Sequence, residues 1–128
     1  MSLISAMYPS VTALNAFGLG TQVIANNLAN AATDGFKTSR TTYAERPRYS
    51  GVGAAVQKME SPPGALRPVE GLPEGRGRGV VQGFLETSNT DVALEMIGLI
   101  LHSRAYQANT KPVSAVNDML GTIINVKV

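Results

Sequence analysis

Side chains spaced for catalysis or metal binding are scarce in this sequence of 128 residues. His102 is the single histidine, cysteine is absent, and no acidic cluster surrounds His102 at metal-ligand spacing. The serine patterns Gly-x-Ser-x-Gly and Ser-x-x-Lys of nucleophilic enzymes do not occur. Glu60, Glu70 and Glu74 fall in a loop-like segment, which is too loosely held for paired-carboxylate catalysis. We therefore expect no enzymatic activity, no metal and no cofactor.

Three further segments resemble ligand-binding motifs only in part. The Gly18–Gly20 segment lacks a third glycine and a preceding strand, so we interpret it as a close approach of helices rather than a dinucleotide site. Residues 75–79 alternate glycine with arginine, and residues 40–49 mix arginines with Tyr43 and Tyr49, as single-strand nucleic-acid binders do. A solvated loop also explains both basic segments. A small basic nucleic-acid-binding protein therefore stays as the alternative function.

Three asparagines, Asn26, Asn27 and Asn30, stand within five positions. Asparagine is a poor helix former, because its side chain competes for nearby backbone groups. Simple capping at a helix end is one explanation for the cluster. The other is that these amides form hydrogen bonds across a helix contact and fix its register, as a buried polar residue does in a coiled coil. The sequence leaves both explanations open.

The elements that position these side chains follow from the distribution of charge. Apolar residues make up 44% of the chain and charged residues only 16%, against about 25% in an average soluble domain. No charged residue precedes Asp34, whereas residues 34–86 hold most of the charges, glycines and prolines. The chain therefore divides into residues 1–33, 34–87 and 88–128. The uncharged start lacks a basic region and is interrupted by polar residues, so we expect neither a cleaved leader nor membrane insertion.

In the first segment, small or apolar residues recur alternately three and four positions apart, as on one face of a helix. Pro9 would clash with the preceding turn inside a helix, so we expect the firm helix to begin near Pro9 and residues 1–8 to be extended or kinked. The Thr33–Gly35 segment is a plausible stop. The stripe consists of Ile4, Met7, Val11, Leu14, Gly18, Thr21, Ala25 and Leu28, widened by Leu3, Phe17 and Ile24.

The last segment carries a second stripe of the same period. Thr90 or Asp91 is the expected N-cap, because its side-chain oxygen can accept from the first free N–H groups. Pro112 is expected to kink this helix or split it near Asn109. The stripe consists of Val92, Met96, Leu99, Ser103, Tyr106, Thr110, Val113, Asn117, Leu120 and Ile124, thickened by Ile97, Ile100, Val116 and Ile123.

The middle segment gives weaker signals. Residues 36–43 and 80–87 are rich in β-branched and aromatic residues and are candidate strands, whereas residues 61–64 and 71–79 have the glycines and prolines of turns or loops. The predicted fold is mainly α. Its N- and C-terminal helices pair as an antiparallel coiled coil, and a short irregular or β-hairpin-like middle joins them.

Two motifs near the ends of the chain resemble those of flagellar basal-body rod and hook proteins. The first is Val-Ile-Ala-Asn-Asn-Leu-Ala-Asn at residues 23–30, followed by Thr33 and the Gly35–Lys37 segment. The second runs from Leu85 to Asp91 and continues in Glu95 to Ile97, Ser103 to Asn109, and Met119 with Leu120. The two matches cover most of residues 11–37 and 84–125, about half of the chain.

The resemblance implies a structural subunit of the bacterial flagellar axis. It implies terminal helices that form an inner tube through the periplasm, and export by the flagellar type III apparatus without a cleaved leader. Other rod subunits would be the partners, in homo- and hetero-oligomeric assembly, and nucleic acid would not. Length favours a C-type proximal rod protein, whereas residues 85–89 favour a short distal-rod type. The residues that the resemblance marks for subunit assembly are Ile24, Asn26, Asn27, Leu28, Asn30, Gly35, Phe36, Ser88, Asn89, Asp91, Met96, Arg104, Tyr106, Gln107, Asn109 and Leu120.

Two departures from the family pattern stand in the C-terminal motif. Leu94 occupies the position three residues after Asp91, where relatives often have an acid that closes a capping box. Pro112 interrupts a stretch that relatives keep helical. The apolar stripes further predict that neighbouring subunits bury what one helix pair leaves exposed, that the termini of the monomer order on assembly, and that Arg104 pairs with Asp91 or Glu95 of a neighbour.

Overall fold

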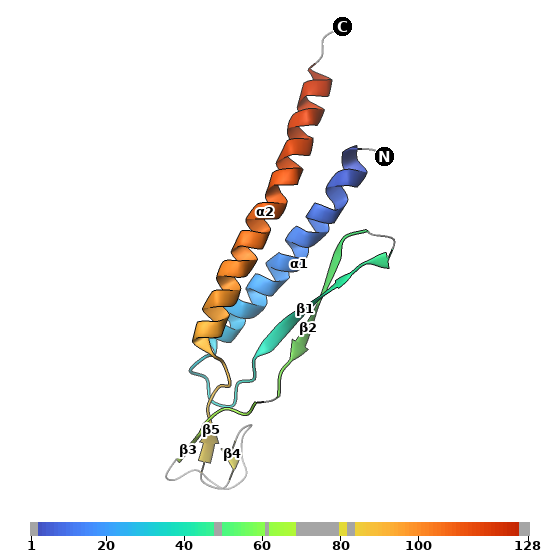
Figure 1. Ribbon diagram of the computed structural model, residues 1–128. Helices are drawn as coiled ribbons and strands as arrows, with labels where there is room; N and C mark the ends of the chain where they lie inside the picture. Colours follow the sequence, from blue (N-terminus) through green and yellow to red (C-terminus); the bar gives the residue numbers. More distant parts are fainter. Residues whose placement is uncertain (1–2, 48–49, 61, 69–79, 82–83, 126–128) are drawn as a thin grey trace.

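The computed structural model describes residues 3–47, 50–60, 62–68, 80–81 and 84–125. Two long helices, α1 (Leu3–Ala29) and α2 (Val92–Ile124), lie side by side and run in opposite directions, and five short strands lie between them in the sequence (Figure 1). The hairpin of β1 (Ser39–Glu45) and β2 (Val52–Lys58) extends along α1. The small sheet beyond the end where the two helices are joined is formed by β3 (Leu66–Pro68), β4 (Val80–Val81) and β5 (Phe84–Glu86). The predicted helix pair with a hairpin-like middle is therefore confirmed.

Helix α1 spans 27 residues and contains Pro9. Residues 3–8 are helical, so of the two predicted alternatives, extended or kinked, the extended one is wrong; residues 1 and 2 lie outside the described residues. Pro9 removes one N–H···O bond, to the carbonyl of Ser5, within two turns of the helix start. That single loss does not outweigh the packing of the turns that follow, in which Thr12 and Ala13 are buried.

Helix α2 spans 33 residues and is continuous through Pro112, so the prediction that it splits near Asn109 is wrong. Asp91 is the N-cap, as predicted, and its Oδ1 accepts from the N–H groups of Ala93 at 2.9 Å and Leu94 at 3.2 Å. The missing N–H at Pro112 costs the helix a bond to the carbonyl of Ala108. Val116, buried one turn later, holds the C-terminal part of the helix against the rest of the molecule.

The β1–β2 hairpin, formed by Ser39–Glu45 and Val52–Lys58, is antiparallel with Ser39 opposite Lys58 and Glu45 opposite Val52. Gly51 has a φ of 101° at its turn, a conformation that favours glycine. The predicted strand at 36–43 overlaps β1 but begins three residues too early. Strand β2 was not predicted, because its Val-Gly-Ala-Ala start has few β-branched residues.

The second sheet consists of β3 (Leu66–Pro68), β4 (Val80–Val81) and β5 (Phe84–Glu86), in the order β3-β5-β4 with antiparallel neighbours. The predicted strand at 80–87 is thus divided between β4 and β5. The loop predicted at 71–79 lies outside the described residues.

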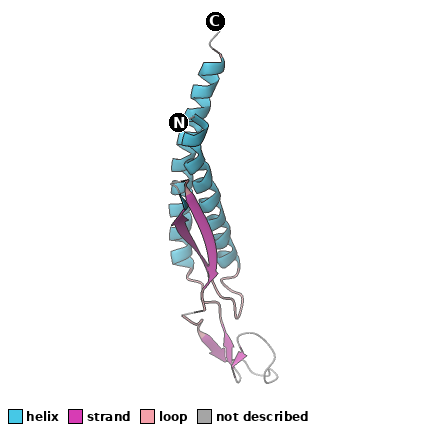
Figure 2. Cartoon of the chain, turned by 90° about the vertical axis from the view of Figure 1, so that its right-hand side faces the viewer, coloured by secondary structure: helices cyan, strands magenta, loops and turns pink. Residues whose placement is uncertain are grey.

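The hairpin covers only one flank of the helix pair, as the side view shows (Figure 2). The Val52 N–H donates to Thr12 Oγ1 at 3.1 Å, which joins β2 to α1. The apolar side chains that are buried in the described residues are few, namely Ala13, Ala16, Ile24 and Val116. Neither helix that the structure describes has a stretch long and apolar enough to cross a membrane.

The helix contact uses the residues that widen the predicted stripe of α1 rather than the centre of that stripe. In α1 the side facing α2 carries Phe17, Gly20 and Ile24, and a Cβ added to Gly98 of α2 would lie 3.2 Å from Ile24 Cδ1. Gly18, which belongs to the predicted stripe, has no described atom within 4 Å of the place that a Cβ would occupy. The predicted stripes are therefore only partly used within one chain.

Candidate assembly interface

Asn27 joins three elements at the closed end of the helix pair. Its side chain is 1% exposed. Its Nδ2 donates to the Ser39 carbonyl at 2.7 Å and to Glu95 Oε1 at 3.0 Å, and its Oδ1 accepts from the Ser39 N–H at 2.9 Å. The amide thus pairs with the start of β1 as a neighbouring strand would, and with the first turn of α2 at the same time. This is the bond across a helix contact that the asparagine cluster suggested.

Asn26 and Asn30 instead finish helix α1. Asn30 Nδ2 donates to the carbonyl oxygen and to Oδ1 of Asn26, both at 2.9 Å, and Thr33 Oγ1 donates to Asn30 Oδ1 at 3.2 Å. Asn26 is exposed. The two explanations of the cluster therefore apply to different residues, capping to Asn26 and Asn30 and register to Asn27.

Asn89 holds together the segments that leave and enter the helices. Its Oδ1 accepts from the Thr38 N–H at 2.7 Å, and its Nδ2 donates to the carbonyls of Met59 at 3.3 Å and Pro62 at 3.0 Å. Its own N–H donates to the Phe36 carbonyl at 3.3 Å. One side chain therefore satisfies three backbone groups that no regular strand pairs.

Glu86 and Lys37 form an ion pair in the same junction. The hydrogen bond from Lys37, together with one from the Gly64 N–H at 2.8 Å, holds the pKa of the Glu86 carboxyl below its ordinary value. The Glu86 carbonyl accepts from the N–H of Gly35 at 2.6 Å. Gly35 has a φ of 70°, in the left-handed region that favours glycine. We call this set of contacts around Asn27, Asn89 and Glu86 the polar junction.

An aromatic cluster fixes the hairpin farther along the helices. The Tyr43 ring centroid lies 5.3 Å from that of Phe17 and 5.8 Å from that of His102, and Tyr43 Oη lies 3.1 Å from His102 Nε2. A Cβ on Gly20 would overlap the Tyr43 hydroxyl and lie 2.6 Å from His102 Cε1. Burial raises the pKa of the Tyr43 phenol. Gly20 therefore provides the close approach that the Gly18–Gly20 segment suggested.

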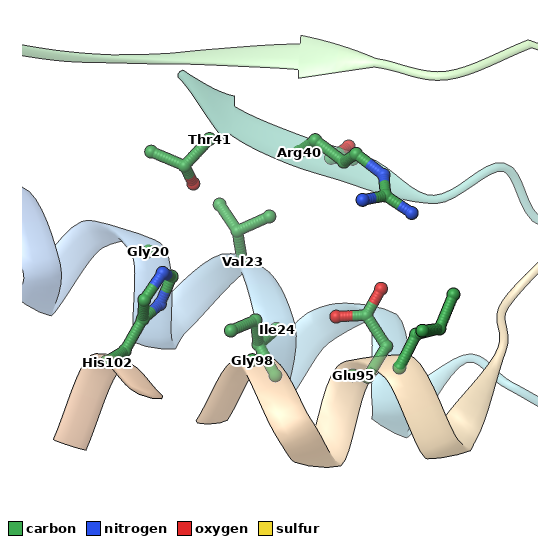
Figure 3. Close-up of a pocket in the computed structure, with 10 residues that line it drawn as sticks. Gly20, Val23, Ile24, Arg40, Thr41, Glu95, Gly98 and His102 are labelled. Carbon is green, nitrogen blue, oxygen red and sulfur yellow. The ribbon is translucent and has the colours of Figure 1, made fainter. Parts of the chain in front are cut away.

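A cleft of about 160 Å³ lies between this cluster and the polar junction. Figure 3 shows the Arg40 guanidinium and the Glu95 carboxylate facing each other across it, with Thr41 and His102 at its other end. Within the described part of the chain Arg40 and Glu95 form no ion pair, and His102 Nδ1 is buried without a hydrogen-bond partner. No group of three His, Asp or Glu side chains there could hold a metal ion. The cleft offers no arrangement of groups for catalysis.

The residues marked by the resemblance fall into two sets. One set builds the chain itself: Ile24 is buried, Asn27 and Asn89 bond backbone groups, and Asp91 caps α2. The other set, which no described residue buries, consists of Leu28, Met96, Arg104, Tyr106 and Gln107. Further marked residues also make bonds within the chain. At and just after the end of α1 these are Asn26, Asn30, Gly35 and Phe36. The Ser88 Oγ donates to Thr90 Oγ1, Asn109 Nδ2 donates to the Ala105 carbonyl, and Leu120 is half-buried. Their role in assembly stays a prediction.

Sequence reasoning missed the backbone partners of these side chains. Ser39, Thr38 and Met59 contribute only main-chain groups to the junction, so their side-chain types gave no signal. Thr12 was missed as well, although a polar residue on an otherwise apolar helix face is a detectable signal.

Large apolar side chains are exposed along much of α2. Ile97 is 55% exposed, Ile100 60% and Leu101 62%. Farther along, α2 projects past the start of α1 (Figure 1), and Ile123 and Ile124 in that part are exposed too. Contiguous apolar patches of this kind mark interaction surfaces in soluble proteins.

Two family models match the two ends of the chain. One, described as Flagella basal body rod protein, matches residues 7–37, and the other, Flagellar basal body rod FlgEFG protein C-terminal, matches residues 81–126. These ranges contain α1 with its asparagines and α2 with its cap.

Individual relatives agree with these models. The chain is 29% identical over 150 residues to the flagellar basal-body rod protein FlgC of Borreliella burgdorferi, which covers 98% of each chain. It is 35% identical over 79 residues to FlgG of the same organism, covering 61% of this chain and 29% of FlgG. It is 36% identical over 58 residues to the flagellar hook protein FlgE of Brucella suis, covering 44% of this chain and 15% of FlgE. The matched regions thus span less than a third of FlgG and of FlgE.

Proposed function

The chain belongs to the flagellar basal-body rod protein family, whose members are structural proteins and not enzymes, and we propose that it assembles into the rod through its two terminal helices. In this proposal the helices of neighbouring subunits pack as coiled coils into a tube in the periplasm. The subunit reaches the rod through the flagellar type III export apparatus.

The observation that carries the proposal is the exposed surface of the single chain. It exposes 9290 Å², whereas a compact monomer of 13.5 kDa is expected to expose about 6,500 Å². The difference of about 2,800 Å² is comparable to the surface that subunits bury in obligate assemblies. On α2, the apolar residues Ile97, Ile100 and Leu101 are more than half exposed.

The charge distribution supports the same proposal. Helix α1 contains no charged residue, and burying an ion between subunits is costly unless it is paired. The charged residues Lys37 and Glu86 pair within the polar junction, away from the helix faces. Helix α1 is therefore suited to contact with neighbours, and the junction to fixing the angle at which the helices leave the middle segment.

Arg104 is an exposed charge among the apolar residues of α2. We expect it to pair with an acid of a neighbouring subunit. Glu95 accepts from Asn27 and Asp91 caps α2, but Asp91 is the more exposed of the two partners considered and is therefore the more accessible to a neighbour.

The alignment with FlgC supports a C-type proximal rod protein, because it covers 98% of both chains. The distal-type alternative has weaker support, because the match to FlgG covers only 29% of that protein. For the nucleic-acid alternative, the structure offers no support in the described residues, since Tyr43 packs on Phe17 and His102. Residues 75–79 lie outside that description.

Deletion of the coding sequence in the parent bacterium tests the proposal. We expect loss of motility and basal bodies that lack a complete rod in electron micrographs. Restoring the unaltered chain should restore both. Normal rods in the deletion strain would refute the proposed function.

A further inference from the structure

The β1–β2 hairpin covers a flank of α1 that consists of small residues (Figure 2). Thr12, Ala16 and Gly20 follow one another at intervals of four, so they form one row along the helix, and all three are buried. The Val52 N–H donates to Thr12 Oγ1, and the Tyr43 hydroxyl overlaps the place that a Cβ on Gly20 would take. We call this row of three residues the covered flank.

The hairpin gives this uncharged flank a charged exterior. Helix α1 contains no charged residue in its 27 positions. Such a helix can be buried on every side, because no ion has to be taken out of water. The charged side chains of the strands, together with the one directly after β1, are all exposed: Arg40, Glu45, Arg46 and Lys58. In the single chain the hairpin therefore places a solvated surface over a helix face that is itself suited to burial.

The contact between the hairpin and the helices is incompletely packed. The cleft of about 160 Å³ is bordered by β1 and both helices, and a second cleft of about 270 Å³ lies between β2 and α1, beside Tyr8 and Asn15. Most residues of both strands are exposed. Gaps of this kind forfeit dispersion contacts, and segments with few buried apolar contacts open at a lower free energy than the whole fold. We therefore expect the hairpin to leave the helices more readily than the chain unfolds.

The hairpin is attached firmly at its base and weakly farther along. At its base, Asn27 exchanges two hydrogen bonds with the backbone of Ser39. Farther along, the Tyr43 hydroxyl lies 3.1 Å from His102 Nε2, and the Val52 N–H donates a single hydrogen bond to the covered flank. The hairpin can therefore swing away about Ser39 while the polar junction stays intact.

Resting on the proposed function, we propose that the hairpin is an autoinhibitory cover. It occupies the covered flank in the single chain, and it swings off when an apolar helix of a neighbouring subunit takes its place. Small residues suit that exchange, because they let another backbone approach closely. Hairpin and neighbour exclude each other, so the apparent affinity of association is lowered by the fraction of chains in which the hairpin has opened. Single chains thereby associate less readily than their exposed apolar surface alone would allow.

A reversible disulfide tests the cover, because the chain has no cysteine of its own. Thr12→Cys combined with Val52→Cys ties β2 to α1. The 3.1 Å bond between Thr12 Oγ1 and the Val52 nitrogen keeps the two Cα atoms within about 7 Å, the limit for a disulfide. The full chain is oxidised while dilute, and mass spectrometry checks that the bond is intramolecular. In sedimentation from micromolar to millimolar concentration, the oxidised form should associate at least about tenfold more weakly than the reduced form of the same protein.

Two further variants make the test specific. Ser39→Cys combined with Lys58→Cys joins two residues that face each other across the hairpin without tying the hairpin to the covered flank, so its oxidised and reduced forms should associate alike. Tyr43→Ala removes a point of attachment and leaves the covered flank unchanged. It should therefore strengthen association at least about threefold relative to the unaltered chain.

Equal association of the oxidised and reduced Thr12–Val52 variant would refute the cover and leave the proposed function standing. A Tyr43→Ala chain that associates no better than the unaltered chain would also refute it. So would failure of the Thr12–Val52 disulfide to form in the folded chain, because β2 would then not lie on the covered flank. If no form associates at millimolar concentration, assembly through the helices fails together with the inference.

Discussion

The side-chain amide of Asn27 on α1 donates a hydrogen bond of 3.0 Å to the carboxylate of Glu95 on α2, although 68 residues separate them in the chain. The same amide exchanges two hydrogen bonds with the backbone of Ser39. Asn27 therefore fixes the register of the two helices and the starting point of the hairpin together. A change there should affect all three elements.

Replacing Asn27 by alanine should lower the free energy of unfolding by about 3 kcal/mol, because it leaves part-buried groups of Ser39 and Glu95 without partners. Urea unfolding followed by far-UV circular dichroism on dilute protein measures this loss. Asn26→Ala is the matched control, since Asn26 is exposed and its side chain bonds only to Asn30 among the described residues, and it should change stability by less than about 0.5 kcal/mol. Equal losses in the two variants would contradict the assigned role of Asn27.

Gly20 and Gly18 should respond oppositely to the same substitution. Gly18→Ala should raise the stability of the monomer by about 1 kcal/mol, because alanine favours the helix and meets no described atom there. Gly20→Ala should lower it, because the new methyl group displaces Tyr43 and His102 and loosens the hairpin. Thermal unfolding of both variants, with limited proteolysis of the hairpin, provides the measurement. Stabilisation by both changes would show that Tyr43 does not pack against α1.

The N-cap of α2 can be tested separately from the junction. Asp91→Ala should cost about 1 kcal/mol, since it removes the acceptor for the N–H groups of Ala93 and Leu94. Hydrogen exchange should accelerate at those two amides in particular. Asp118→Ala, an exposed acid inside the same helix, should leave them unchanged. An unaltered exchange rate in Asp91→Ala would mean that the cap does not form in solution.

The helices were predictable from the sequence because period and capping are local properties. Asp91 was one of two candidates for the cap, and the second helix begins where the prediction placed it. The effects of Pro9 and Pro112 were overestimated. A single missing N–H is a local cost, whereas the packing that offsets it, such as the burial of Val116, depends on distant parts of the chain.

The candidate interface was less predictable, because its geometry depends on backbone groups. Asn26 and Asn27 are identical in type and adjacent, and only the path of β1 determines which of them meets Ser39. Helical period identifies an apolar face but does not say what covers it. The stripes were expected to be buried partly within the chain and partly by neighbouring subunits, but the period does not show that Gly18 and Ser103 line a groove open to solvent.

Acidification should weaken the polar junction through Glu86. Hydrogen bonds from Lys37 and from the Gly64 N–H lower the pKa of this carboxyl in the folded chain, whereas the unfolded chain keeps the ordinary value of 4.5. The folded state therefore binds the proton less readily than the unfolded state. The stabilisation is fully present above pH 4.5, and it is lost as the pH falls through the lowered pKa of Glu86 in the folded chain.

Glu86→Gln should remove this part of the pH dependence, so that its urea midpoint falls less steeply with acid than that of the unaltered chain. Glu45→Gln, which changes an exposed carboxyl at the end of β1, should keep the full acid dependence. Parallel curves for the unaltered chain and Glu86→Gln would show that the Lys37–Glu86 pair does not contribute to holding the junction.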